Sequence, residues 1–84
     1  MRIYMQTPPV AEAPPRFYHL ILEPDLLGGW SLVREWGRQG GPGRVRREHF
    51  EAREAAEAAF QRARDAQLRR GYRVVYVEGE GGSP

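Results

Sequence analysis

The 84-residue chain has no cysteine and no lysine. Without cysteine it can form neither a disulfide framework nor a cysteine-based zinc site, so its hydrophobic core must hold it together. This length gives one small domain, near the lower limit for chains that fold without a metal or a disulfide. No apolar run approaches the roughly 18 residues of a membrane-spanning helix, and no hydrophobic segment follows the initial Met-Arg as in a secretory signal. The expected location is therefore the cytoplasm, with no membrane contact.

The sequence also lacks a recognisable arrangement of catalytic side chains, metal ligands or nucleotide-binding residues. His19 and His49 lie in strand-like segments without the spacing of metal ligands, so we interpret them as structural or surface residues. Ser31 has no base partner that the sequence can place beside it. The glycines of residues 37–43 are not followed by the Lys-Ser/Thr of a nucleotide-binding loop, and a strand rather than a helix comes next. The sequence predicts a non-catalytic protein with no metal and no cofactor.

What the chain does have is arginine, which supplies all 13 basic residues and leaves a net charge of +2. Five of them fall in residues 34–47, where Glu35 is the one acid, while four glutamates follow in residues 48–57. The planar guanidinium binds phosphate or carboxylate through two hydrogen bonds and stacks on rings. A weakly charged protein with one basic face has the footprint of a nucleic-acid binder, although a solvated face of mixed charge explains the same composition.

Alternating apolar residues predict strands in the first third of the chain. Residues 2–6 are expected to form a short edge strand, and residues 7–15, with four prolines, an extended connector. Residues 17–23 form the next strand, with apolar side chains on both faces. Residues 24–29 form a turn, in which Leu26 and Leu27 are expected to plug into the core.

A central hairpin is predicted next, from a strand over residues 30–36, a glycine-rich loop over 37–43 and a strand over 44–50. Trp30, Leu32, Arg34 and Trp36 share one face of the first strand. In the second strand two adjacent arginines, at positions 46 and 47, point to opposite faces unless the strand is bulged.

Residues 51–70 are predicted to form a helix, because alanines recur with a period near 3.6 and Phe60 lies among them. The stripe consists of Ala52, Ala55, Ala56, Ala59, Phe60 and Ala63. Gly71 is placed just past the helix end, residues 72–78 form a last strand, and residues 79–84 a flexible tail. The fold class is α+β: a small antiparallel β-sheet with one α-helix packed on it. We divide the chain into an N-terminal edge strand and Pro-rich connector (1–15), a domain (16–78) and the tail (79–84).

The run from Trp36 to Gly40, Trp-Gly-Arg-Gln-Gly, and the Gly-Trp-Ser-Leu-Val-Arg-Glu that precedes it resemble the WGR domain. The similarity continues through the glycine turn, Phe50, the alanine-rich helix and Arg70-Gly71-Tyr72, and so covers roughly residues 16–73. The family is known from DNA-damage-activated poly(ADP-ribose) polymerases, where the domain contacts DNA ends and neighbouring domains, and stand-alone bacterial members exist. The chain has no catalytic or zinc-finger region, so the resemblance does not imply ADP-ribosyl transfer.

The resemblance implies that Trp36 stacks on the sugar of a terminal nucleotide, that Arg38 lies near phosphate or a partner domain, and that Gly37 keeps the turn open. The predicted function is nucleic-acid binding, with DNA favoured over RNA. The candidate binding residues are Trp36, Gly37, Arg38, Arg44, Arg46 and Arg47. Two alternatives stay open for single residues: a core position for Trp36, and an ion pair of Arg38 with Glu35 or Glu48. A third alternative is a protein-interaction module that holds an acidic partner, or a second copy of the chain, on the same surface.

Overall fold

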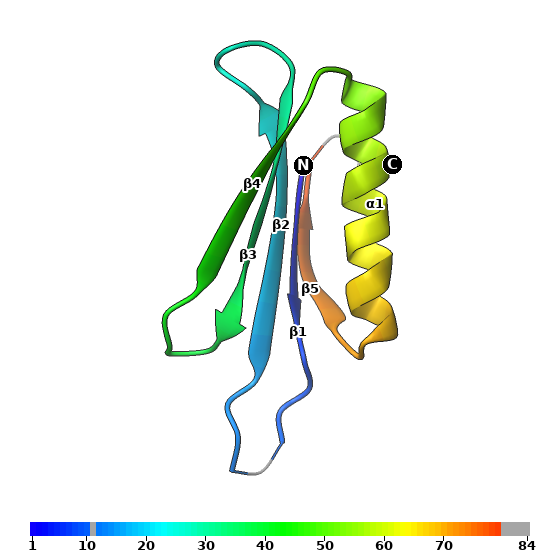
Figure 1. Cartoon of the computed structure of the whole chain (residues 1–84). Helices are drawn as coiled ribbons and strands as arrows, with labels where there is room; N and C mark the ends of the chain where they lie inside the picture. Colours follow the sequence, from blue (N-terminus) through cyan, green and yellow to red (C-terminus); the bar gives the residue numbers. More distant parts are fainter. Residues whose placement is uncertain (11, 80–84) are drawn as a thin grey trace.

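The computed structural model describes residues 1–10 and 12–79 and shows a five-stranded antiparallel sheet with one helix against it (Figure 1). The strands are β1 (Arg2–Gln6), β2 (Arg16–Pro24), β3 (Trp30–Arg38), β4 (Arg44–Phe50) and β5 (Arg73–Glu78), and the helix is α1 (Arg53–Arg69). They lie in the order β4-β3-β2-β1-β5 across the sheet. The predicted α+β fold and the β3–β4 hairpin are confirmed. Residues 80–84 of the expected flexible tail lie outside the described residues.

The prediction that residues 2–6 form an edge strand was wrong, because β1 lies inside the sheet. It pairs with β2 on one side and with β5 on the other, so the sheet edges are β4 and β5. The two ends of the proline-rich connector after it are held together by hydrogen bonds. Arg16 donates its amide to the Thr7 hydroxyl at 2.9 Å, and the Thr7 amide bonds the Arg16 carbonyl at 2.9 Å. Alternation within five residues cannot reveal that a second partner strand arrives some seventy residues later.

The core lies between α1 and the face of the sheet that α1 covers. Phe60, which is 1% exposed, is the largest side chain that the helix buries there. The other buried apolar residues of this core are Ile3, Met5, Tyr18, Leu20, Leu22, Leu32, Ala56, Ala59 and Ala63. Small alanines allow the helix to lie close to the sheet, and each large side chain buried here contributes about 1.5–3 kcal/mol.

The helix begins later than the alanine pattern indicated. Ala52 is its N-cap residue with an extended backbone, and Ala52 and Ala55 are both exposed. The buried stripe therefore runs from Ala56 to Ala63 and continues to Gln67, a polar residue that the pattern did not include. At the other end Gly71 follows the C-cap with a φ of 99°, as predicted, and turns the chain toward β5.

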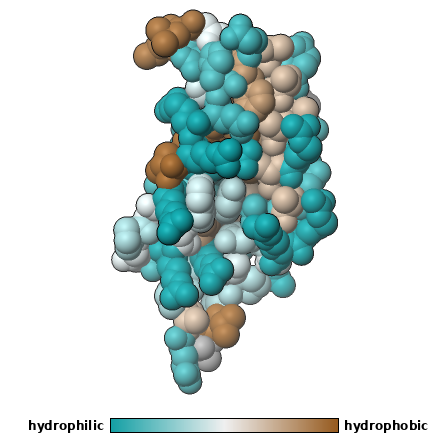
Figure 2. All heavy atoms as spheres, viewed as in Figure 1, coloured by the Kyte–Doolittle hydropathy of each residue, from teal (hydrophilic) through white to brown (hydrophobic). Residues whose placement is uncertain are grey.

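Leu26 and Leu27 are fully exposed, at 102% and 95%, so the expectation that they plug into the core was wrong. The turn between β2 and β3 is tight. The Asp25 amide bonds the Gly29 carbonyl at 3.0 Å, and the Leu27 amide donates to Asp25 Oδ1 at 3.0 Å. This geometry leaves both leucines at the tip of the turn, and a hydrophobic protrusion is visible at that end of the molecule in Figure 2. No helix among residues 1–10 and 12–79 has the length and apolar character needed to cross a membrane.

Candidate nucleic-acid interface

Strand pairing places the predicted binding residues of β3 and β4 on particular faces of the sheet. Trp36 lies opposite Arg44, and Arg34 lies opposite Arg46, on the face that α1 covers. Arg47 instead lies opposite Val33 on the other face, and its Nη1 is 3.5 Å from Glu23 Oε2. Arg47 therefore cannot act on the same surface as its neighbour Arg46, as the alternation of a regular strand predicts.

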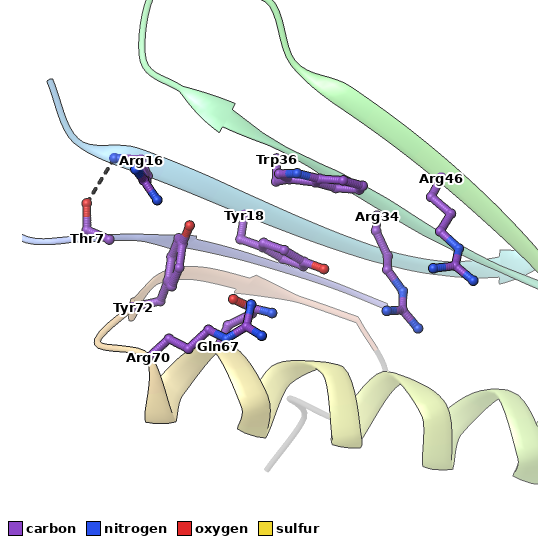
Figure 3. Close-up of a pocket in the computed structure, with 9 residues that line it drawn as sticks. All are labelled: Thr7, Arg16, Tyr18, Arg34, Trp36, Arg46, Gln67, Arg70 and Tyr72. Carbon is purple, nitrogen blue, oxygen red and sulfur yellow. Dashed lines mark hydrogen bonds between the residues drawn. The ribbon is translucent and has the colours of Figure 1, made fainter.

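A cleft of about 490 Å³ opens between this face of the sheet and the C-terminal end of α1 (Figure 3). It is lined by Thr7, Arg16, Tyr18, Arg34, Trp36, Arg46, Gln67, Arg70 and Tyr72. In Figure 3 the arginines of β3 and β4 reach down toward the helix, while Gln67 and Arg70 reach up from it. Three strands and the helix end thus direct guanidinium groups toward one space.

A second cleft, of about 440 Å³, adjoins the first one. It is lined by Arg16, Trp36, Gly37, Arg38, Arg44 and Tyr72. Arg16, Trp36 and Tyr72 line both clefts. We call the two clefts together the arginine groove. It contains five of the six predicted binding residues, all except Arg47.

The aromatic side chains of the groove, Trp36, Tyr18 and Tyr72, contact one another in sequence. The rings of Trp36 and Tyr18 lie nearly parallel, with centroids 5.8 Å apart and planes at 17°. Tyr72 meets Tyr18 edge-on at 5.9 Å. Trp36 is half-buried and packs against the core, yet it lines both clefts. Its position is therefore intermediate between the core and the exposed alternatives that the sequence left open.

The positive charge of the groove is largely uncompensated. Arg34 pairs through Nη2 with Glu48 Oε1 at 3.3 Å, and its buried Nε has no hydrogen-bond partner among the described residues. The expected alternative for Arg38, an ion pair with Glu35 or Glu48, is absent from the described part of the chain. The other five groove arginines also form no ion pair there; they are Arg16, Arg38, Arg44, Arg46 and Arg70. Within residues 1–10 and 12–79 no acidic side chain lines either cleft, so five guanidinium groups of the groove have no ion-pair partner there.

Gln67 is the groove residue that the sequence reading missed most clearly. It is only 6% exposed, and its carboxamide, which lines the groove, forms no hydrogen bond with any described residue. A carboxamide both donates and accepts hydrogen bonds, so it is suited to a polar ligand group. The helical period could have identified Gln67 as buried, because it follows Ala63 by four residues and so continues the buried stripe of the helix.

Arg16, Tyr18, Arg70 and Tyr72 were not among the predicted site residues either. They come from β2 and from the turn between α1 and β5, which only the folded sheet brings to the hairpin. Gly37 allows a close approach of backbone. A Cβ at this position would lie 3.1 Å from the Cα of Gly43 and 3.1 Å from the carbonyl of Pro42.

Ser31 and His49 both bond Asp25 rather than each other. The Ser31 hydroxyl, which is fully buried, donates to Asp25 Oδ2 at 2.7 Å. His49 Nδ1 lies 3.1 Å from the same oxygen, so the histidine bonds the carboxylate and not the serine. Hydrogen bonds from Leu27, Ser31 and His49 lower the pKa of Asp25 to about 2. This cluster fastens the β2–β3 turn to β4 at the end of the sheet away from the groove.

The surroundings of the two histidines shift their pKa values in opposite directions. Hydrogen bonds to Asp25 and Glu51 raise the pKa of His49. Burial lowers the pKa of His19, as does the charge of Arg2, and its ring meets Tyr4 edge-on at 5.5 Å. In the part of the chain that the structure describes, no group of three histidine, cysteine or acidic residues could hold a metal ion.

Comparison with known proteins agrees with this architecture. The family model of the WGR domain matches residues 1–78, so the match includes β1 as well as the segment that shows the motif. A protein of Sinorhizobium fredii (strain NBRC 101917 / NGR234), uncharacterized protein y4dW, is 33% identical over 72 residues. The match covers 86% of this chain but 35% of that protein, so the chain spans about a third of its relative. No solved structure matches the chain at a significant level. WGR domains are in general nucleic-acid-binding modules rather than catalytic domains, and this chain belongs to the WGR family.

Proposed function

We propose that the chain is a non-catalytic module that binds DNA in the arginine groove. One observation carries the proposal: five arginines without an ion-pair partner in the described chain surround the stacked rings of Trp36 and Tyr18, and no acid among the described residues lines the space. Guanidinium groups bind phosphate oxygens through two hydrogen bonds, and rings offer a surface on which a base or a sugar stacks. The preference for DNA over RNA rests on the resemblance to WGR domains that contact DNA ends.

The size of the groove favours a strand end over the side of a duplex. Its two clefts, of about 490 and 440 Å³, are in the range of small-ligand sites, so each accepts a nucleotide but not a double helix. The terminal nucleotide would enter beside Trp36, where the half-buried ring leaves part of its surface open. Arg38 and Arg44, at the exposed rim, would contact the phosphates that follow. Gln67 would bond a polar group of the inserted nucleotide.

Phosphate contacts position a nucleic acid without reading its sequence. We therefore expect little sequence preference, apart from any selectivity that Gln67 gives for the terminal nucleotide. A cytoplasmic location, expected from the sequence, would bring the module to the DNA of a bacterial cell.

The test is fluorescence anisotropy with a labelled, 5′-phosphorylated DNA duplex, using wild type, Trp36→Leu and Trp36→Phe. Loss of the ring in Trp36→Leu should weaken binding by about 1–3 kcal/mol, or roughly 5- to 150-fold. Trp36→Phe keeps a ring and should lose less. Circular dichroism checks that both variants fold, because Trp36 also packs against Tyr18.

A single-stranded RNA and a polyglutamate peptide serve as competitors in the same titration. An acidic protein partner would use the same arginines, so strong competition by polyglutamate with little effect of Trp36→Leu would favour the protein-interaction alternative. No binding of DNA by folded wild type at low salt would overturn the proposal.

A further inference from the structure

The outer edge of β5 is apolar and open. Among the described residues β5 pairs only with β1. The helix α1 packs mainly over β2 and β3, also covers Ile3 and Met5 of β1, and reaches β5 only where Phe60 and Val77 line the same pocket. Four consecutive side chains of the strand are between 45% and 58% exposed: Val74, Val75, Tyr76 and Val77. An exposed edge strand with apolar side chains is a template for pairing with another chain.

The two edges of the sheet differ in their protection. The opposite edge, β4, has arginine at positions 44, 46 and 47, so a second copy would be repelled there. The β5 edge, Arg-Val-Val-Tyr-Val-Glu, has one charge of each sign, and these charges lie at its two ends. A strand with this arrangement is complementary to itself when two copies run antiparallel.

An irregularity in the β1–β5 pairing decides which β5 side chains share a face. Tyr4 lies opposite Tyr76 while Met5 lies opposite Val74, so Val75 is the extra residue of a bulge. Beyond the bulge the pairing is regular, with Arg2 opposite Glu78 and Gln6 opposite Arg73. Met5 is buried under the helix, so Val74 shares that face, as does Val77 opposite the buried Ile3. Arg73 and Glu78 consequently share the other face.

We propose that β5 pairs with β5 of a second copy of this chain about a two-fold axis, which joins two sheets into one. In this register Arg73 lies opposite the partner's Glu78, and Val74 lies opposite the partner's Val77. Opposed residues in an antiparallel pair share a face, and here they do so only because of the bulge. In an unbulged strand, residues five apart such as Arg73 and Glu78 would point to opposite faces.

The assembly closes at two copies. A two-fold interface uses the same strand from both chains, so each β5 edge is satisfied and the arginine-lined β4 edges face outward. The arginine groove remains open, because it is built from β2, β3, β4 and the end of α1, with Tyr72 just before β5. The inference is independent of the proposed function. Pairing of six residues gives a small interface, so the association should be weak and the dimer should form only at higher protein concentration.

The charges at the ends of β5 allow a swap test by analytical ultracentrifugation of the full chain over a range of concentrations. Wild type should change from monomer to dimer as the concentration rises. Arg73→Glu places two glutamates opposite each other at both ends of the interface, and Glu78→Arg does the same with arginines, so each variant should weaken association at least 10-fold. The double variant restores opposite charges and should recover dimerisation. Both substituted side chains are exposed, but Glu78 Oε1 also lies 3.4 Å from Arg2 Nε of its own chain, so thermal melts check that each variant keeps the fold.

Arg62→Glu is the matched control. It makes the same charge change as Arg73→Glu on an exposed residue of α1, on the side of the helix that faces β4. Its dimerisation should equal that of wild type. Wild type that stays monomeric at every concentration overturns the proposal, and any pairing of the β5 edge would then be with a different protein. A dimer that is unaffected by the single substitutions, or that the double variant fails to restore, overturns the Arg73–Glu78 register.

Discussion

Arg46 and Arg47 are neighbours on β4 that project from opposite faces of the sheet, and they provide a matched pair of substitutions. Arg46 lines the arginine groove and has no ion-pair partner in the described chain, whereas Arg47 pairs with Glu23 on the other face. Both side chains are exposed, so replacement by glutamine should leave the core intact in both cases. Any difference in DNA binding therefore reports which face of the sheet contacts the phosphates.

The groove sets the expected size of the effect. Five arginines are free to contact phosphate, since Arg34 already pairs with Glu48. Each contact contributes about −0.9 to the slope of log K against log salt concentration, so the wild-type slope should reach roughly −4.5. Raising salt from about 50 to about 200 mM would then weaken wild-type binding about 500-fold. For Arg46→Gln the slope falls to roughly −3.6 and the loss to about 150-fold.

The assay is anisotropy titration of a labelled DNA duplex at four or more salt concentrations. Arg46→Gln should bind more weakly than wild type at low salt, and the two should converge as salt rises. Arg47→Gln should show the same salt dependence of DNA binding as wild type, because Arg47 lies on the face away from the groove. Loss of its exposed ion pair should change the folding stability by only about 0–1 kcal/mol. Equal effects of the two substitutions, or a larger effect of Arg47→Gln, would show that the groove is not the binding face.

Three further predictions concern single side chains. Because the pKa of His49 is raised in the folded protein, its bond to Asp25 stabilises the fold fully below the unfolded value of 6.5 and is lost as pH rises through the raised pKa. Urea denaturation should therefore show that His49→Gln is less stable than wild type near pH 6 and equally stable near pH 9. A difference in unfolding free energy that does not change with pH would contradict this. His19 is present in both proteins, so its opposite contribution cancels from that difference. Gly29→Ala should lower the free energy of unfolding by more than about 1–3 kcal/mol, since φ is 77° and a Cβ would lie 2.5 Å from the Phe50 carbonyl; an unchanged midpoint in the same denaturation would refute it. Gln67→Leu should keep or raise the thermal midpoint, because the side chain is only 6% exposed and its carboxamide has no bond to any described residue. DNA affinity should fall about 5-fold by loss of roughly 1 kcal/mol, and unchanged affinity would exclude a role in binding.

Local patterns predicted most of the secondary structure. The alternation in β2, β3 and β4 identified the strands and the face that each side chain occupies, and the period of the alanines identified the helix. These signals depend only on neighbours in the sequence. The position of β1 inside the sheet and the exposure of Leu26 and Leu27 depend on pairing and on turn geometry, so apolar character alone gave the wrong expectation for both.

The candidate site was predictable only in its hairpin part. The motif pointed to Trp36 and Arg38, and the charge run pointed to Arg44 and Arg46. The remaining groove residues come from β2, the end of α1 and the start of β5. Tyr72 lies 36 positions after Trp36 in the chain yet lines the same clefts. Such contacts arise from the order of strands in the sheet, which single-sequence patterns do not encode.

The two tryptophans permit a direct test of where DNA binds. Trp36 lies in the groove, whereas Trp30 lies at the other end of β3 with the Arg53 guanidinium 5.0 Å from its ring centroid. Trp30→Phe leaves Trp36 as the one tryptophan, and Trp36→Phe leaves Trp30. On titration with a 5′-phosphorylated DNA duplex, the emission of Trp36 should change and saturate with the binding curve, while that of Trp30 should stay constant. A change in Trp30 with none in Trp36, under conditions where anisotropy shows binding, would place the DNA elsewhere on the sheet and contradict the groove as the binding site.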